Sequence, residues 1–278
     1  MKKLILIGKN SFVAKNIYHY LKKIIKVKKV DYSKFKKIKK KELENFDYLI
    51  NCSLSKRYIK YKYSESNDID FKIAKKISNL RLRMVFLSSR KVYKPRNNIK
   101  ETSLLKPKSF YSKNKLVTEK KLSKLLDKKV LILRVSNLIG KINLNCKYRK
   151  IHNTFIDNFF INIKNNKMFD NKNIYKDFIS TRKFSEIIRK LLKVNAHGVF
   201  NISIGEKIFL KDLVNWLNHY NKSKNIDLVK IPNNFNKDCF YLNNSKLKNK
   251  IKINISKLEL KNFCINLSRD FFKSAKLK

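Results

Sequence analysis

The chain has 278 residues, 43% of them apolar, so it can bury a full core as one large domain or two unequal ones. Its formal net charge of +48 would suit a nucleic-acid partner, but only ten of the 68 cations are Arg and the cations are spread over the whole chain. The excess of Lys, Asn and Ile fits a drift in base composition better than a selected basic surface, so we do not expect a nucleic-acid partner.

Residues with metal or redox chemistry do not cluster along the sequence. Cys52, Cys146, Cys239 and Cys264 are isolated from one another, and the four histidines form no HExxH motif. No signal peptide precedes the first strand, and no apolar run approaches the roughly 20 residues that span a bilayer. We therefore expect no metal site, no membrane span and a reducing, cytoplasmic location.

Short apolar runs alternate with segments of helical period in the first half of the chain. Strands are expected at 4–7, 27–30, 48–52, 84–87 and 130–135, and helices near 12–23, 66–79 and 110–126. After residue 140 the expected elements are a helix near 183–193, a strand at 199–203, a helix near 210–220, a strand near 227–231 and a helix near 256–274. This alternation predicts an α/β fold, with a Rossmann-type doubly wound parallel sheet in residues 1–140. A smaller mixed α/β substrate lobe in residues 141–278 is expected to be partly interwoven with it.

The first expected strand runs into "GKNSFVAK", which opens the first helix. Strand, tight turn and helix are the context of a dinucleotide-binding fingerprint, which asks for three glycines. Gly8 occupies the first of these places, Ser11 the second and Ala14 the third, where the pattern tolerates Ala. The amides of Phe12 and Val13, at the amino end of the helix, would face a bound pyrophosphate. We expect this loop to bind a dinucleotide cofactor.

An acidic residue follows the second expected strand. Asp31 lies 23 residues after Gly8, where a carboxylate can accept a hydrogen bond from the ribose 2′-hydroxyl and would repel a 2′-phosphate. The neighbouring Lys34 could soften that repulsion. NAD is therefore the expected cofactor, and NADP stays open.

Two further segments carry a coherent acid–base chemistry. "FLSSRKVY" puts Ser88 and Ser89 at the carboxyl end of a buried strand, the edge where open α/β sheets bind ligands. "KPKSFYSKNKL" places Tyr111 and Lys115 four residues apart, on one face of a helix. A phenol becomes a useful base near neutral pH when an ammonium favours the phenolate, and a serine hydroxyl can orient the substrate oxygen. Beside a nicotinamide ring, these groups would interconvert an alcohol and a ketone.

Eight segments in order resemble the extended short-chain dehydrogenase/reductases, in particular the branch of nucleotide-sugar epimerases and dehydratases. They run nearly from end to end of the chain: "LILIGKNSFVAKNIYHYL", "FDYLINCSLS", "FLSSRKVY", "PKSFYSKNK", "LRVSNLIGK", "KDFIS", "GVFNISIGEKIFLKDLVNWL" and "LNNSKLKNKI". The resemblance implies a Rossmann fold, NAD or NADP as cofactor and a nucleotide-sugar as substrate.

The resemblance also implies roles for single residues. Tyr111 would be the acid–base group, Lys115 would hold the nicotinamide ribose and tune Tyr111, and Ser89 would hydrogen-bond the reacting sugar hydroxyl. Asn137 would contact the nucleotide-sugar or cap a turn, and both interpretations stay open. Lys176 would contact the substrate. The implied cofactor-binding residues are Gly8, Asn10, Ser11, Phe12, Val13, Asp31, Ser53, Tyr111 and Lys115.

Three departures from the family pattern bear on function. Asp70 stands where the family has an asparagine, so one cofactor-side hydrogen bond is in question. Lys176 replaces an arginine, which gives a point charge in place of a bidentate phosphate clamp. The "RK" after Ser89 lacks the Asp-Glu pair of dehydratase members, so dehydration is not expected.

The sequence therefore predicts an NAD(P)-dependent enzyme that modifies a nucleotide-sugar, as an epimerase or a 4-keto reductase. The resemblance implies a place in the synthesis of surface polysaccharides or glycan precursors. The alternative is a non-catalytic descendant of the same fold that binds NAD or nucleic acid. The sequence does not choose between epimerase and reductase, and a homodimer stays open.

Overall fold

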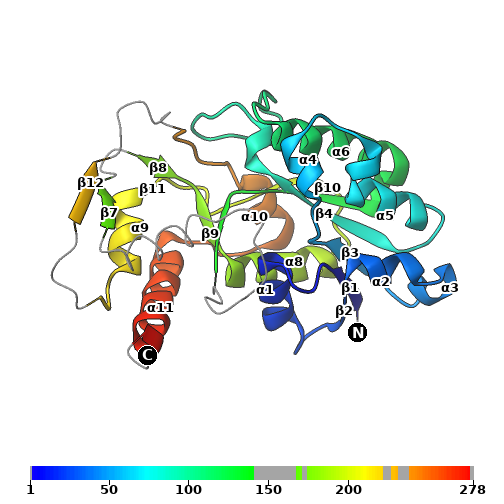
Figure 1. Ribbon diagram of the computed structural model, residues 1–278, viewed down its shortest axis with the longest axis horizontal. Coiled ribbons are helices and arrows are strands. Elements are labelled where there is room, and N and C mark those ends of the chain that lie inside the picture. Colours follow the sequence, from blue (N-terminus) through cyan, green and yellow to red (C-terminus); the bar gives the residue numbers. More distant parts are fainter. Residues whose placement is uncertain (1, 141–166, 171–173, 222–226, 231–237, 276–278) are drawn as a thin grey trace.

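A six-stranded parallel sheet forms the centre of the protein, which a computed structural model describes over residues 2–140, 167–170, 174–221, 227–230 and 238–275 (Figure 1). The strands lie in the order β10 (Gly198–Ile202), β5 (Val130–Val135), β4 (Arg83–Ser89), β3 (Tyr48–Asn51), β1 (Lys3–Ile7) and β2 (Lys26–Val30). Every neighbouring pair is parallel. After β2 the chain crosses to the other side of β1, so the switch point at which such sheets bind ligands lies between β1 and β3. The predicted doubly wound sheet is confirmed.

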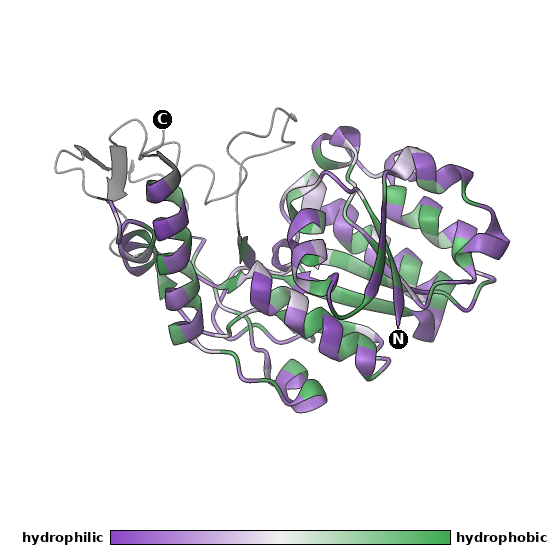
Figure 2. Cartoon of the chain, turned by 90° about the horizontal axis from the view of Figure 1, so that it is seen from below, coloured by the Kyte–Doolittle hydropathy of each residue, from purple (hydrophilic) through white to green (hydrophobic). Residues whose placement is uncertain are grey.

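The inner strands β1, β3, β4 and β5 are buried on both faces, which explains their apolar runs, whereas the edge strand β2 exposes three lysines. In β1, Leu4 and Leu6 point into one core layer, and Ile5 and Ile7 point into the other. Helices cover both layers: α1 (Phe12–Leu21) and α8 (Thr181–Lys193) lie on the first, and α5 (Ile69–Ile77) and α6 (Phe110–Leu126) lie on the second. Figure 2 shows the apolar strands between helices with hydrophilic outer faces.

The predicted helices near 12–23, 66–79 and 110–126 are confirmed as α1, α5 and α6. Within the described residues, four short helices are additional to the prediction: α2 (Tyr32–Lys37), α3 (Lys40–Leu43), α4 (Lys56–Lys60) and α10 (Ser245–Ile251). Single 3₁₀ turns are η1 (Glu65–Asn67), η2 (Arg90–Val92) and η3 (Asp127–Lys129). The four helices have four to seven residues, too few to show a helical period in a Lys-rich sequence. Each of the first two helices buries one side chain, Phe35 in α2 and Leu43 in α3, so tertiary packing and not periodicity stabilises them.

The second half of the chain returns to the central sheet. The predicted helix near 183–193 and strand at 199–203 are α8 and β10, and β10 pairs with β5. Residues on both sides of the predicted boundary near 140 therefore build one sheet. The division into residues 1–140 and 141–278 stays a prediction.

Outside the central sheet, on the left in Figure 1, short strands and helices form a smaller group of elements, called the smaller lobe. Among the described residues, its two-stranded sheets pair β6 (Asn137–Ile139) with β9 (Phe178–Ser180), β8 (Tyr175–Lys176) with β11 (Ile208–Phe209), and β7 (Lys167–Asp170) with β12 (Asp227–Lys230). The predicted helices near 210–220 and 256–274 are α9 (Leu210–Leu217) and α11 (Lys257–Ala275), which pack against each other. In the described part of the chain, no helix combines the length and the apolar character needed to cross a membrane.

Candidate active site

The carboxyl ends of the central strands meet along one edge, because the strands are parallel. Ile7 at the end of β1 lies opposite Asn51 of β3, and Ser89 at the end of β4 lies opposite Val135 of β5. Four predicted site residues end these strands or follow them within two residues: Gly8, Ser53, Ser89 and Asn137. The fold therefore brings the first turn and the strand-end residues of the predicted site to the same edge.

Gly8 makes the tight turn from β1 into α1. Its φ is 88°, a left-handed conformation, and its amide donates to the carbonyl oxygen of Val30 at 2.8 Å. A Cβ at this position would lie 2.8 Å from the backbone nitrogen of Ser53 and 2.9 Å from the carbonyl carbon of Cys52. Glycine alone satisfies both the positive φ and the close approach of the loop after β3. The geometric requirement behind the first fingerprint glycine is thus met at this position.

Ser11, in the second glycine place, is the N-cap of α1. Its Oγ accepts a hydrogen bond from the amide of Ala14 at 3.1 Å, and its own amide donates to the carbonyl oxygen of Gly8 at 2.9 Å. A helix leaves its first amides without partners inside the helix, and this cap satisfies one of them. The amides of Phe12 and Val13 come before the capped amide. Ser11 therefore stabilises the helix start in a way that glycine would not.

Asp31 follows β2, as predicted, and forms an ion pair with Lys9 (Nζ to Oδ2, 2.9 Å). Lys9 belongs to the turn after β1, so the ion pair joins that turn to the end of β2. The side chains of Lys9 and Asp31 are 41% and 33% exposed, which leaves both accessible to a ligand. The sequence pointed to Lys34 as the cation near Asp31, and the contact in the structure is made by Lys9 instead.

Tyr111 and Lys115 lie in the first two turns of α6, whose start is fixed by a capping box. Ser109 Oγ accepts from the amide of Ser112 at 3.2 Å, and Ser112 Oγ accepts from the amide of Ser109 at 3.1 Å. Because Tyr111 and Lys115 are four residues apart in an α-helix, they share one face. Tyr111 is half-buried and Lys115 is buried. The predicted pair thus sits on a helix with an anchored amino end.

The ammonium of Lys115 is held by a carboxylate of the neighbouring helix. Lys115 Nζ lies 3.5 Å from Oδ2 of Asp70 in α5, and the two side chains are only 6% and 5% exposed. The same Nζ lies 4.3 Å from the centre of the Phe86 ring in β4. Burial raises the pKa of Asp70 to about 6, against the opposing effect of Lys115. Because position 70 holds Asp and not the asparagine of the family pattern, a carboxylate lies against Lys115.

The two serines at the end of β4 have different environments. Ser88 is buried and its Oγ donates to Glu119, which forms an ion pair with Arg134 at 2.6 Å. Ser89 points to the other face of the strand, is half-buried, and accepts a hydrogen bond from the amide of Lys91 at 3.2 Å. Ser88 therefore belongs to a structural network, while Ser89 is the more accessible hydroxyl at the sheet edge.

Asn137 is bound to the backbone of the neighbouring strand. Its backbone N–H donates to the carbonyl oxygen of Asp177 at 3.3 Å, and its side-chain Nδ2 donates to the same oxygen at 3.0 Å. These bonds help to join β6 to β9. This contact joins two strands and caps no turn, and the contact of Asn137 with a nucleotide-sugar stays a prediction.

Lys176 in β8 joins a cluster of charges around Asp238. Asp238 accepts two hydrogen bonds from Arg90, one of them 3.0 Å long, and its Oδ2 lies 3.8 Å from Nζ of Lys176. The guanidinium carbon of Arg90 lies 3.8 Å from the centre of the Phe240 ring. Burial lowers the pKa of Lys176, while Asp238 opposes that effect. Because Arg90 follows Ser89 in sequence, this cluster adjoins the predicted active site.

A family model covers most of this framework. The model, described as the NAD dependent epimerase/dehydratase family, matches residues 8–203, which is more than half of the chain. The chain belongs to this family. The match includes Gly8, Ser89, Tyr111 and Lys115, and the NAD dependence of the family agrees with the predicted cofactor. No curated protein is similar enough in sequence to match.

Solved structures share the fold of this family member over nearly its whole length. The UDP-N-acetylglucosamine 4-epimerase from Methanobrevibacter ruminantium M1, in complex with UDP-N-acetylmuramic acid, has a TM-score of 0.76 at 19% identity, over 98% of this chain and 99% of its own. The dTDP-glucose 4,6-dehydratase from Bacillus anthracis str. Ames, in complex with NAD, has a TM-score of 0.72 at 16% identity, over 99% and 98%. The dTDP-4-dehydrorhamnose reductase from the same organism, in complex with NADP, has a TM-score of 0.70 at 15% identity, over 98% and 100%. At these identities the likeness shows the fold alone.

Several residues around the candidate site of this epimerase/dehydratase family member have no clear signal in the sequence. In a chain with 68 cations, no pattern singles out Lys9 or Arg90. Asp70 stands out only as a departure from the family pattern, and its contact with Lys115 joins two helices that are separate in the sequence. Asn51 does have a local signal, since it is a polar residue that ends the apolar run of β3.

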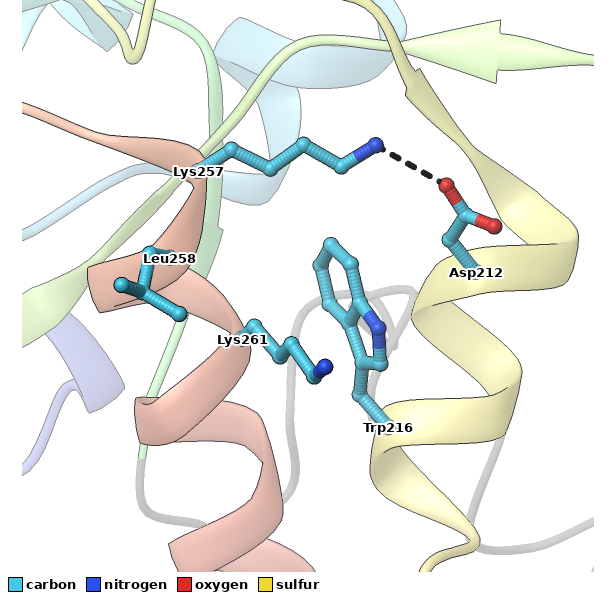
Figure 3. Close-up of a pocket in the computed structure, with 5 residues that line it drawn as sticks. All are labelled: Asp212, Trp216, Lys257, Leu258 and Lys261. Atoms are coloured by element: carbon cyan, nitrogen blue, oxygen red, sulfur yellow. Dashed lines mark hydrogen bonds and ion pairs between the residues drawn. The ribbon is translucent and has the colours of Figure 1, made fainter.

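A surface hollow of about 410 Å³ lies away from these residues, between α9 and α11 (Figure 3). Its lining residues are Asp212, Trp216, Lys257, Leu258 and Lys261, and Lys257 pairs with Asp212 at 3.0 Å. None of the predicted site residues lines this hollow, so the candidate site stays at the sheet edge. Within the described ranges, no group of three or more His, Cys, Asp and Glu side chains could hold a metal ion.

Proposed function

We propose that this member of the family interconverts a hydroxyl and a keto group on the sugar of a nucleotide-sugar, as an epimerase or a 4-keto reductase. The observation that carries the proposal is the packing of Lys115 in α6 against Phe86 of β4, the strand that ends at Ser89. Family membership supports the same reaction class.

The turn after β1 fits a dinucleotide such as NAD. The missing Cβ of Gly8 lets the backbone pack closely, and the capped start of α1 leaves the amides of Phe12 and Val13 for a phosphate. When bound, NAD supplies a two-electron acceptor and donor. The residues proposed to hold it are Gly8, Asn10, Ser11, Phe12, Val13, Asp31 and Ser53, together with Tyr111 and Lys115.

In the proposed reaction, the chain's own residues move one proton and hold the sugar. The phenol oxygen of Tyr111 takes the proton of the sugar hydroxyl during oxidation and returns it during reduction. The ammonium of Lys115 favours the phenolate and holds the cofactor ribose, and the hydroxyl of Ser89 hydrogen-bonds the reacting oxygen. Asn137 and Lys176 are proposed contacts to the rest of the nucleotide-sugar.

Tyr111→Phe tests this proposal. A thermal-shift panel of NAD, NADP and UDP-, GDP-, CDP- and dTDP-sugars at physiological salt identifies ligands, and turnover is then measured with those that bind. We expect Tyr111→Phe to lower turnover by about 10²–10⁴-fold, because it removes the proton-transfer group, and to keep most of the NAD-induced rise in melting temperature, because the other proposed cofactor contacts remain. Tyr61→Phe is the matched control, since Tyr61 is 61% exposed.

Other outcomes decide between the alternatives. Unchanged turnover in Tyr111→Phe would contradict the acid–base role. NAD that stays bound through purification favours an epimerase, whereas NADPH consumption with a 4-keto sugar favours a reductase. Binding to RNA or DNA with a steep loss of affinity in salt, and no shift with NAD, would favour the non-catalytic alternative.

A further inference from the structure

A buried carboxylate, that of Asp70, lies beside the proposed acid–base pair. Its Oδ2 is 3.5 Å from Nζ of Lys115, and the side chains of Lys115 and Asp70 are 6% and 5% exposed. Two aromatic rings border the ammonium, with their centres at 4.3 Å for Phe86 and 5.7 Å for Tyr58. Among the described residues, Asp70 is therefore the counter-ion of Lys115.

Asp70 is itself held by the loop that packs against the first turn. Its Oδ1 accepts a hydrogen bond from Nδ2 of Asn51 at 2.9 Å. Asn51 also binds both backbone groups of Ser53: its Oδ1 accepts from the amide at 2.9 Å, and its Nδ2 donates to the carbonyl oxygen at 3.1 Å. Ser53 is the residue that a Cβ at Gly8 would strike. Contacts thus run from Lys115 through Asp70 and Asn51 to the turn proposed to hold the cofactor.

Other titratable groups come from each element packed around Asp70. They are Asp68 at the N-cap of α5, Cys52 after β3, Tyr58 in α4 and Lys115 in α6. Asp68 has its own donors, including the hydroxyl of Thr118 at 2.7 Å. Burial raises the pKa of Cys52 and the pKa of Tyr58 above their usual ranges, so both groups are neutral near neutral pH. Within the described chain, the cation that balances Asp70 is thus Lys115.

We propose that Asp70 is a positioning residue of the acid–base pair: it fixes the ammonium of Lys115, balances its charge, and so sets the pH at which Tyr111 exchanges its proton. This inference rests on the proposed function of Tyr111 and Lys115. An unpaired ammonium strongly favours a neighbouring phenolate, whereas an ammonium paired with a carboxylate presents little net charge to it. An amide at position 70 would keep an oxygen beside the ammonium without cancelling its charge.

Asp70→Asn tests the inference, because the side chain keeps its shape and loses its charge. The readouts are the pH dependence of kcat/KM for sugar oxidation and the titration of the ¹³Cζ resonance of Tyr111, which is identified by its absence from Tyr111→Phe. We expect both midpoints to move to lower pH by about one unit, which is about tenfold more phenolate below the midpoint. A purely structural role would lower the melting temperature or the maximal rate and leave both midpoints unchanged, and that result would overturn the inference.

Asp212→Asn is the matched control, since it breaks another Asp–Lys ion pair, with Lys257 at 3.0 Å, in the smaller lobe. We expect it to leave both midpoints unchanged, and a shift equal to that of Asp70→Asn would overturn the inference. If no nucleotide-sugar is turned over, the proposed function fails. The titration of Tyr111 in the wild type and in Asp70→Asn still tests the positioning role of Asp70.

The wild-type protein gives a second measurement, because Asp70→Asn leaves a buried cation without its counter-ion and can fail to fold. The ¹³Cε resonance of Lys115, identified by its absence from Lys115→Arg, is expected to shift at the pH where Asp70 takes up a proton. A Lys115 resonance that does not respond to that step would overturn the inference.

Discussion

Single residues define the geometry of the turn after β1. The φ of Gly8 is 88°, and the backbone of Ser53 occupies the place where a side chain would begin. Ser11, in the place of the second fingerprint glycine, caps α1 through the amide of Ala14. The turn, and the places of Gly8 and Ser11 in it, could be predicted from the sequence, because a dinucleotide-binding fingerprint is a pattern of nearby residues. The Lys9–Asp31 ion pair is not local, since it joins the ends of two strands, and no pattern in the sequence predicts it.

Gly8→Ala is expected to weaken NAD binding by about tenfold or more, equivalent to about 1.4 kcal/mol. The new Cβ would meet the backbone of Ser53 at 2.8 Å, so the turn or the loop after β3 has to move. Thermal melting with and without NAD measures the loss.

Gly198→Ala is the matched control for this prediction. Gly198 has a φ of 80°, and nothing lies within 4 Å of a Cβ placed there. Both variants carry the cost of a left-handed residue, about 1–2 kcal/mol, but only Gly8→Ala adds a clash. Equal NAD-induced shifts in the two variants would contradict a role for Gly8 in holding the cofactor.

At the scale of secondary-structure elements, α6 is the helix that brings the proposed chemistry to the sheet. The spacing of Tyr111 and Lys115 and the helix around them could be predicted, because helical periodicity is written in consecutive residues. The neighbours of α6 could not be predicted in the same way. α4 packs on α6 through a hydrogen bond between the hydroxyls of Tyr58 and Thr118 at 2.7 Å, and its single short turn leaves no periodic signal.

Ser109→Ala is expected to lower the free energy of unfolding by about 1 kcal/mol, because it removes the capping box that fixes the start of α6. Urea denaturation measures the change. Ser55→Ala is the matched control: Ser55 is the N-cap of α4, but its side chain makes no cap hydrogen bond. We expect Ser55→Ala to lower the free energy of unfolding by less than about 0.5 kcal/mol. Equal losses in the two variants would show that the Ser109 cap does not stabilise the protein.

At the scale of the whole molecule, Asp177 joins segments that are far apart in the sequence. This buried carboxyl accepts hydrogen bonds from the amides of Leu242 at 2.9 Å, Ile204 at 3.1 Å and Gly205 at 3.3 Å. Burial raises the pKa of Asp177 to about 7, although these backbone donors oppose the shift. A group of this kind makes the stability of the assembled fold depend on pH.

The sign of that dependence follows from the raised pKa of Asp177. A carboxyl whose pKa is higher in the folded than in the unfolded state contributes stability that is complete below about pH 4, and the contribution is lost as the pH rises through about 7. We expect the wild-type protein to lose on the order of 4 kcal/mol across this window relative to Asp177→Asn, measured by urea denaturation at several pH values. Asp70 contributes in the same direction in both proteins and cancels in the comparison. Wild-type stability that rises with pH relative to Asp177→Asn would show that the backbone donors outweigh burial.

The sequence by itself determined the α/β class, the strands of the central sheet, the long helices, the Gly8 turn and the spacing of Tyr111 and Lys115. Each of these is recorded in consecutive residues, as periodicity, as a turn requirement or as a fixed spacing. Only the tertiary structure decided the strand order, the return of β10 to the sheet and the partners of the buried charges. Lys115 with Asp70 and Arg90 with Asp238, 148 residues away, are contacts between separate elements. Among so many lysines, the choice of partner depends on how helices and strands pack, because burial fixes which charges must be neutralised.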